Sequence, residues 1–152
     1  MRTLSLCVLF VILFCASQGL AAKMSRCGVA NMLLKYGFPR KDLADWVCLI
    51  EHESSFRTNV VGPPNTDGSR DYGLFQINSR YWCSGDGPSH NMCRIPCRML
   101  LSNDMTHSIR CAVTVFRKQG LSAWYGWSGH CQGNAPSVEN CFRSYNNLYY
   151  GK

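Results

Sequence analysis

Two acidic stretches of this chain hold the residues best suited to chemistry. Glu51 and Glu53 follow an apolar segment, and Asp71 lies within a polar, turn-rich segment. A carboxyl group that packs against apolar side chains loses hydration, so its pKa rises toward the range that a general acid needs. A carboxyl group among Asn and Ser side chains stays ionised. Two carboxyl groups in such contrasting surroundings are the arrangement that glycoside hydrolysis uses.

Helical spacing does not say which glutamate is the acid. The apolar residues between positions 43 and 50 recur at the period of an α-helix. At about 100° per residue, Glu51 and Glu53 then lie at opposite margins of the apolar face. Either residue could instead be an ordinary solvated glutamate near a helix end.

Other chemistries find little support in the sequence. It contains neither a Gly-rich phosphate loop nor a Gly-x-Ser-x-Gly elbow. His107 and Cys111 stand four residues apart, but two ligands alone make a weak metal motif. We therefore expect neither a metal nor a cofactor. The four histidines are dispersed along the chain: His52, His90, His107 and His130.

Aromatic residues offer flat surfaces on which sugar rings could stack. The alternative is that these rings belong to the core, as most Trp side chains of a small domain do. The candidates for sugar stacking are Tyr81, Trp82, Trp124 and Trp127.

The elements that must position these residues are helices at both ends of the chain. Helical periodicity covers residues 29–36, 43–50 and 105–116. Between the second and third helices, Asp67-Gly68 predicts a hairpin turn, and residues 72–77 are rich in strand formers. This order predicts an α+β domain. Candidate N-caps for the third helix are Ser102, Asn103 and Asp104.

Residues 1–22 have the features of a secretory signal peptide. Arg2 precedes an apolar run over residues 4–14, and small residues follow at 19–22. The run is too short to span a bilayer, which disfavours the alternative of a retained membrane anchor. We expect cleavage after Ala22 and a secreted, extracellular protein.

Cysteine number agrees with export. Of ten cysteines, Cys7 and Cys15 fall in the leader, and an even number remains, which predicts four disulfides. Counting does not choose among their possible pairings. Cys93 and Cys97 form the one close pair, and Pro96 between them makes a zinc site a poor explanation.

The chain is basic, with a formal charge of +7. A basic secreted protein is attracted to polyanions such as acidic glycans and bacterial envelopes. Because the charges are scattered, the sequence does not predict nucleic-acid binding. The amphipathic segments need their apolar faces for the core, so we expect no stable membrane insertion.

Residues 65–83 resemble the signature of the c-type lysozymes. His52-Glu53-Ser54-Ser55-Phe56 is similar to the catalytic helix end of that family, and Cys93-Arg94-Ile95-Pro96-Cys97 and Ala123-Trp124 match it too. The resemblance covers residues 23–141, is closer to the insect branch, and leaves 142–152 as a C-terminal tail. It implies a helical lobe and a small antiparallel β lobe, with an active-site cleft between them.

The resemblance implies a role for each residue. Glu53 would be the acid and Asp71 the nucleophile or electrostatic stabiliser, so Glu51 would take no part. Trp124 would form an apolar wall beside Glu53, and the Ala123 backbone would bind an N-acetyl group. Asn65, Gln76 and Asn78 would surround Asp71 and the sugar, and Tyr81 and Trp82 would line the cleft. The implied disulfides are Cys27–Cys141, Cys48–Cys131, Cys83–Cys97 and Cys93–Cys111.

Some positions depart from the family pattern. Tyr81 stands where many relatives have Trp, which predicts stacking over a smaller surface. Residues 119–122 are shorter than in vertebrate relatives and lack a carboxylate, which weakens the case for distal sugar binding. Asp104 has no acidic neighbours, so we expect no calcium site.

Together these features predict a secreted, monomeric lysozyme that cleaves bacterial cell-wall peptidoglycan with retention. Its basic charge favours antibacterial defence over digestion. One alternative is a non-catalytic, lysozyme-like glycan-binding or regulatory protein, although such relatives generally lack one or both carboxylates. Another is a cationic protein that disrupts membranes without hydrolysis.

Overall fold

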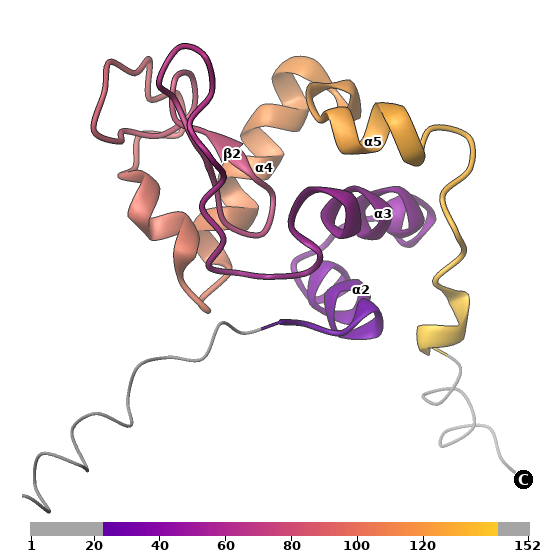
Figure 1. Cartoon of the computed structure of the whole chain (residues 1–152). Coiled ribbons are helices and arrows are strands. Elements are labelled where there is room, and N and C mark those ends of the chain that lie inside the picture. The colour runs from indigo at the N-terminus through magenta and orange to yellow at the C-terminus, as the bar shows by residue number, and fades with distance from the viewer. Residues whose placement is uncertain (1–22, 143–152) are drawn as a thin grey trace, which may run out of the picture.

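A computed structural model describes residues 23–142 of the chain. The predicted signal peptide (1–22) and all but the first residue of the predicted tail (142–152) lie outside the described residues. Within them, a helical part faces a smaller part made mostly of loops (Figure 1). The elements are α2 (Arg26–Lys35), η2 (Arg40–Asp42), α3 (Leu43–Ser54), β1 (Asp71–Tyr72), β2 (Ile77–Asn78), η3 (Cys97–Leu101), α4 (Thr106–Gln119), η4 (Leu121–Ala123), α5 (Tyr125–His130) and η5 (Glu139–Phe142).

Helix α3 is the central element of the helical part. It packs against both α2 and α5, and six of its apolar side chains are buried. The helix ends at Ser54 because Ser55 adopts the left-handed conformation with φ 51°. The apolar side chains of α3 therefore anchor this helix end against the core, next to the two glutamates.

The N-terminus of α4 corrects one sequence prediction. The predicted caps were Ser102, Asn103 and Asp104, but the N-cap is Met105, without a side-chain hydrogen bond. Asp104 acts one position earlier, where its carboxylate accepts hydrogen bonds from the Thr106 N–H and hydroxyl. The polar residues therefore form a turn that leads into the helix rather than its cap.

The small sheet is also shorter than predicted. β1 and β2 are antiparallel, with Asp71 opposite Asn78, and residues 73–76 of the predicted strand form the turn between them. Gly73 has φ +73°, and a Cβ there would meet the Leu100 carbonyl oxygen at 2.0 Å. Because the chain turns at this glycine, the side chains of residues 74 and 75 enter the core.

The predicted turn at Asp67-Gly68 exists, but the segments on its two sides do not form a regular hairpin of paired strands. A single bridge between Val61 and Tyr72 flanks it, and Gly68 has the positive φ that such turns favour. Side-chain hydrogen bonds, including those to Asp71, therefore connect the segments of this region.

Four disulfides join these parts, in the pairs that the family resemblance implies. Cys27–Cys141 joins α2 to η5, and Cys48–Cys131 joins α3 to the end of α5. Cys83–Cys97 and Cys93–Cys111 hold the loops, the latter to α4. Each disulfide typically stabilises a small secreted domain by about 2–4 kcal/mol.

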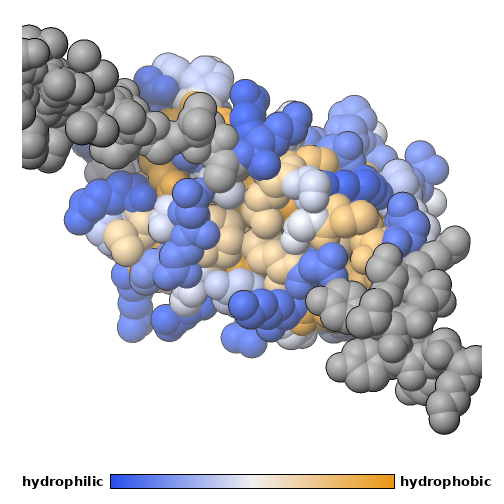
Figure 2. All heavy atoms as spheres, turned by 90° about the horizontal axis from the view of Figure 1, so that it is seen from below, coloured by the Kyte–Doolittle hydropathy of each residue, from blue (hydrophilic) through white to orange (hydrophobic). Residues whose placement is uncertain are grey.

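A single hydrophobic cluster runs through the molecule and continues beneath the cleft. The ring of Trp46 lies at its centre, 5.0 Å from the Phe38 ring and 5.6 Å from the Trp124 ring. Seen from below, the molecule has hydrophobic residues in the middle of the face, framed by hydrophilic ones (Figure 2). Within residues 23–142, no helix combines the length and apolar character needed to cross a bilayer.

Candidate active site

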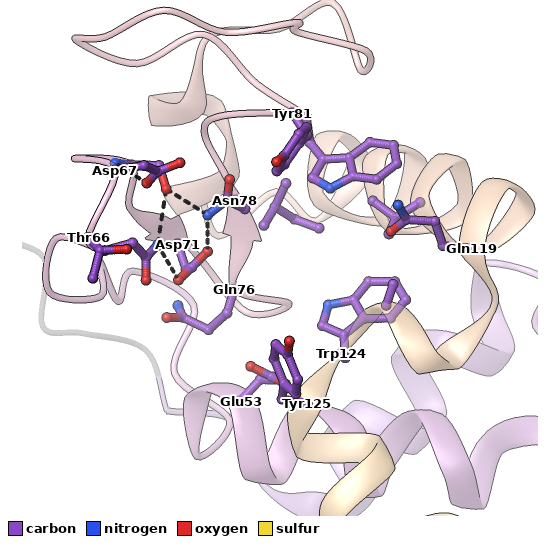
Figure 3. A pocket seen from close by; sticks show the side chains of 16 residues that line it. Glu53, Thr66, Asp67, Asp71, Gln76, Asn78, Tyr81, Gln119, Trp124 and Tyr125 are labelled. Carbon is purple, nitrogen blue, oxygen red and sulfur yellow. Dashed lines mark hydrogen bonds between the residues drawn. The ribbon is translucent and has the colours of Figure 1, made fainter.

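A cleft of about 510 Å³ separates the helical part from the loop-rich part. The end of α3, the start of α5 and η4 line one wall, and the loops around β1 and β2 line the other (Figure 3). The lining residues are Glu53, Asn65, Thr66, Asp67, Ser69, Asp71, Gln76, Ile77, Asn78, Tyr81, Trp82, Val115, Gln119, Ala123, Trp124 and Tyr125.

Glu53 lies one residue before the end of α3 and faces this cleft. Burial raises the pKa of its carboxyl group above the usual value, and the negative charge of Asp71 raises it further. The N–H of Gly126 donates a 2.8 Å hydrogen bond to Oε1, which partly opposes these effects. The net shift is upward, so this carboxyl group keeps its proton to a higher pH than an ordinary glutamate does.

Asp71 has the opposite surroundings. The Asn78 amide donates to one carboxylate oxygen at 2.9 Å, and the Asn65 amide donates to the other at 3.2 Å. The Ser69 hydroxyl accepts a hydrogen bond from each of these amides and so connects them. These hydrogen bonds fix the position of both carboxylate oxygens at the loop wall of the cleft.

The structure separates the two glutamates that helical spacing left equivalent. Glu51 does not line the cleft but pairs with Arg26, whose Nη1 lies 2.6 Å from its Oε2. Arg26 also donates to the Pro136 carbonyl, so this contact ties α2 to the C-terminal loop. Glu51 is therefore occupied in a structural ion pair, and Glu53 alone faces Asp71.

Three of the four candidate stacking residues line the cleft. Trp124 and Trp82 are each 5% exposed, so both are partly core residues, while Tyr81 is half exposed. The Trp124 indole N–H donates to the Phe75 carbonyl across the cleft floor. Trp127 does not line the cleft: it packs against the core and its N–H donates to Asp45 on α3, so the alternative of a core residue holds for it.

Gln76 and Ala123 both line the cleft, but Gln76 does not hydrogen-bond to Asp71. Its amide donates to the carbonyls of Val60 and Gly73 and holds the turn between the strands. Gln76 therefore supports the wall that carries Asp71.

Sequence reasoning missed several lining residues. Gln119 and Tyr125 come from the helical wall, and Thr66 and Asp67 come from the loop wall. Hydrogen bonds from the hydroxyl and N–H of Ser69 lower the pKa of Asp67. A signal for Tyr125 was available, since it directly follows Trp124 in a segment already assigned to the site.

One group of potential metal ligands occurs among the described residues. A His52 nitrogen and the sulfur atoms of Cys48 and Cys131 lie within 4.8 Å of one another. The two sulfurs are joined in a disulfide, which removes the thiolates that a metal would need. The His52 ring instead stacks on His130, with 4.2 Å between ring centroids.

The geometry combines a proton donor in an apolar setting with a hydrogen-bonded carboxylate across a cleft. Such a pair can protonate a leaving oxygen and stabilise or bond to an electron-poor carbon. Asn side chains and aromatic surfaces around the pair suit a polar ligand with flat apolar faces, which describes a pyranose.

Comparisons with known proteins agree with this geometry. The profile of the C-type lysozyme/alpha-lactalbumin family matches residues 22–141. Lysozyme D of Drosophila melanogaster is 47% identical over 137 residues, covering 89% of this chain and 97% of its own. Lysozyme P of the same species is 50% identical over 124 residues, covering 80% and 87%.

A solved structure, that of recombinant wild-type canine milk lysozyme, has a TM-score of 0.72 and 36% identity. The match covers 81% of this chain and 98% of that one. The chain therefore belongs to the C-type lysozyme/alpha-lactalbumin family. Its fold is the α+β fold of that family, and its activity is that of a lysozyme, a glycosidase. The expected likeness to the insect branch is confirmed.

Proposed function

We propose that this protein hydrolyses the β-1,4 bond between N-acetylmuramic acid and N-acetylglucosamine in bacterial peptidoglycan. The observation that carries the proposal is the half-buried Glu53, held by the Gly126 N–H and facing Asp71 across one cleft. Family membership supplies the substrate class, and the site supplies the residues.

Glu53 is the general acid of the first step. It gives its proton to the glycosidic oxygen, so the bond from that oxygen to the anomeric carbon breaks and the leaving sugar departs as an alcohol. Asp71 faces the same carbon and either bonds to it or stabilises its positive charge. The Asn65 and Asn78 amides hold Asp71 in place through this step.

In the second step Glu53 is a base. Its carboxylate removes a proton from water, the water oxygen bonds to the anomeric carbon, and the bond or contact with Asp71 is released. Two displacements on the same carbon give retention of configuration. Both carboxyl groups return to their starting states, and no metal or cofactor takes part.

The cleft walls bind the sugar chain. Tyr81 and Trp82 contact sugar faces, the Ala123 backbone bonds to an N-acetyl group, and Trp124 keeps water from Glu53. Gln76 supports these contacts by holding the loop wall.

The protein works outside the cell. Four disulfides agree with an oxidising compartment, and residues 1–22 serve as the export signal. Removal of this signal leaves a monomer with a lysozyme domain over residues 23–141 and a tail over 142–152. The basic charge attracts it to anionic bacterial envelopes, in keeping with antibacterial defence.

The deciding experiment is a pH–rate profile on purified peptidoglycan, measured by the release of new reducing ends. We expect a bell-shaped profile that reports the two carboxyl groups as a coupled pair. Binding without new reducing ends at any pH from about 4 to 8 would favour a non-catalytic glycan-binding protein. Bacterial killing that is undiminished in the double variant Glu53→Gln/Asp71→Asn would favour membrane disruption.

A further inference from the structure

Tyr125, the first residue of α5, places a large aromatic ring at the Glu53 end of the cleft (Figure 3). The residue is 94% exposed, the highest value among the exposed large hydrophobic residues of the described chain. A ring with so much surface in water adds almost nothing to core stability. Packing therefore does not explain why an aromatic residue stands at the mouth of this site.

The residues on both sides of Tyr125 are hydrogen-bonded to other parts of the chain. Trp124 before it is buried, and its indole N–H donates to the Phe75 carbonyl at 2.8 Å. Gly126 after it donates its N–H to Glu53 Oε1, also at 2.8 Å. Tyr125 thus has an exposed ring between two hydrogen-bonded neighbours, and it directly precedes the residue whose N–H contacts Glu53.

The cleft has a second exposed aromatic residue at its other end, and the two differ. The Tyr81 ring is half exposed and stacks on His90, with 5.8 Å between centroids and 10° between planes. Figure 3 shows Tyr81 far from Glu53, while Tyr125 lies on the same wall as Glu53. The two tyrosines therefore face different sugars of a bound chain.

The position of Glu53, the proposed proton donor, indicates which sugar lies near each tyrosine. The oxygen that receives the Glu53 proton leaves with the departing sugar, so that sugar starts at Glu53 and extends beyond it. We propose that Tyr125 is a stacking platform for the departing sugar, and hence also for a sugar that replaces water in the second step. This inference rests on the proposed function and adds a specificity-determining residue to it.

The replacement step follows the same chemistry as hydrolysis. A hydroxyl of an acceptor sugar bonds to the anomeric carbon, its proton passes to the Glu53 carboxylate, and Asp71 is released. A new glycosidic bond forms in place of the one that broke. A platform that holds the acceptor raises its local concentration over that of water, and so favours transfer.

The test compares substrates with different leaving groups. Chitohexaose cleaved at its central bond loses chitotriose, whereas the β-fluoride of chitotriose loses fluoride and leaves the platform empty. For Tyr125→Ala we expect kcat/KM on chitohexaose to fall about tenfold, as loss of one stacking contact predicts, with a clearly smaller fall on the fluoride. With the fluoride as donor and added chitobiose as acceptor, the ratio of transfer to hydrolysis should also fall several-fold.

Two variants sharpen this comparison. Tyr125→Phe keeps the ring and should retain most of the transfer. Tyr36→Ala removes an exposed tyrosine that follows α2, outside the cleft, and should leave both rates unchanged. Equal losses on both substrates, or an unchanged transfer ratio in Tyr125→Ala, would overturn the inference. A parent protein that cleaves neither substrate would overturn the proposed function and this inference with it.

Discussion

The two walls of the cleft hold their carboxyl groups by different means. Glu53 stands on a helix whose apolar side chains enter the core and whose Cys48 is bonded to the end of α5. Asp71 stands on a strand of two residues and is held by amide side chains. Burial raises the pKa of the first group, and hydrogen bonds from amide side chains position the second. The same functional group, a carboxyl group, thus has different properties on the two walls, and different substitutions should disrupt each of them.

The most severe change on the helical wall is Glu53→Gln. It removes the proposed proton donor at almost constant shape, so we expect turnover of peptidoglycan to fall about 10³-fold or more. The release of reducing ends measures this loss. Glu51→Gln is the matched control, since it breaks only the partly exposed Arg26 pair and should keep activity within about twofold. Similar losses in both variants would show that the acid has been misassigned.

The corresponding change on the loop wall is Asp71→Asn. It keeps the shape but removes the charge that we propose stabilises the cationic sugar, so kcat should fall about 10²- to 10³-fold. Binding of chitotriose, measured by calorimetry, should change far less than kcat. A loss that appears only in KM would assign Asp71 to binding rather than to chemistry.

Gly126→Ala tests how the helical wall aims its acid. A Cβ at this position would lie 2.8 Å from Glu53 Oε1 and 3.1 Å from the His52 Cβ. The carboxyl group must move, and a displaced catalytic group costs about 10- to 100-fold in kcat. The hydrogen bond from the Gly126 N–H lowers the pKa of Glu53. Loss of this hydrogen bond when the carboxyl group moves should therefore also shift the basic limb of the pH–rate profile to higher pH. The same change at Gly129 meets no atom within 4 Å and serves as the control.

Asn78→Ala tests the loop wall in the same way. It removes the shorter of the two amide hydrogen bonds to Asp71, while Asn65 remains. We expect about a tenfold loss of kcat, in line with one charge-assisted hydrogen bond of about 1.5 kcal/mol. Activity equal to that of the parent would mean that Asn65 alone positions the carboxylate.

The smallest expected effect concerns stability. The pKa of Glu53 is higher in the folded than in the unfolded state. Ionisation of this group therefore costs no folding free energy at a pH below the unfolded-state pKa, and it lowers the free energy of unfolding as the pH rises from there through the folded-state pKa. Glu53→Gln should therefore raise Tm at pH 7 relative to the parent, by a few degrees at most, and by less at pH 4. Scanning calorimetry at both pH values measures the difference. An equal gain at both would trace it to something other than burial of the charge.

The sequence predicted best those features that depend only on residues close together in the chain. The helices around residues 29–36 and 43–50 and the polar surroundings of Asp71 followed from nearby residues. The choice between Glu51 and Glu53 did not, because it depends on Arg26, which is distant in sequence but lies 2.6 Å away.

Other features also required the tertiary structure. Trp127 and Trp124 are three residues apart, and the sequence alone does not show that Trp124 lines the cleft while Trp127 contacts Asp45. Residues 73–76 have strand-forming side chains, but the close approach of Gly73 to the Leu100 carbonyl turns the chain there. In both cases the outcome depends on a contact with a part of the chain that is distant in sequence.

The bond between Cys27 and Cys141 has a consequence for survival in fluids that contain proteases. It joins residues 114 positions apart and so closes nearly the whole described chain into a covalent ring. One cut at any exposed loop inside that ring yields no separate fragments. A clipped molecule would keep its full mass on a non-reducing gel and could retain both cleft walls in register. Nicking would then become visible only once reductant is added.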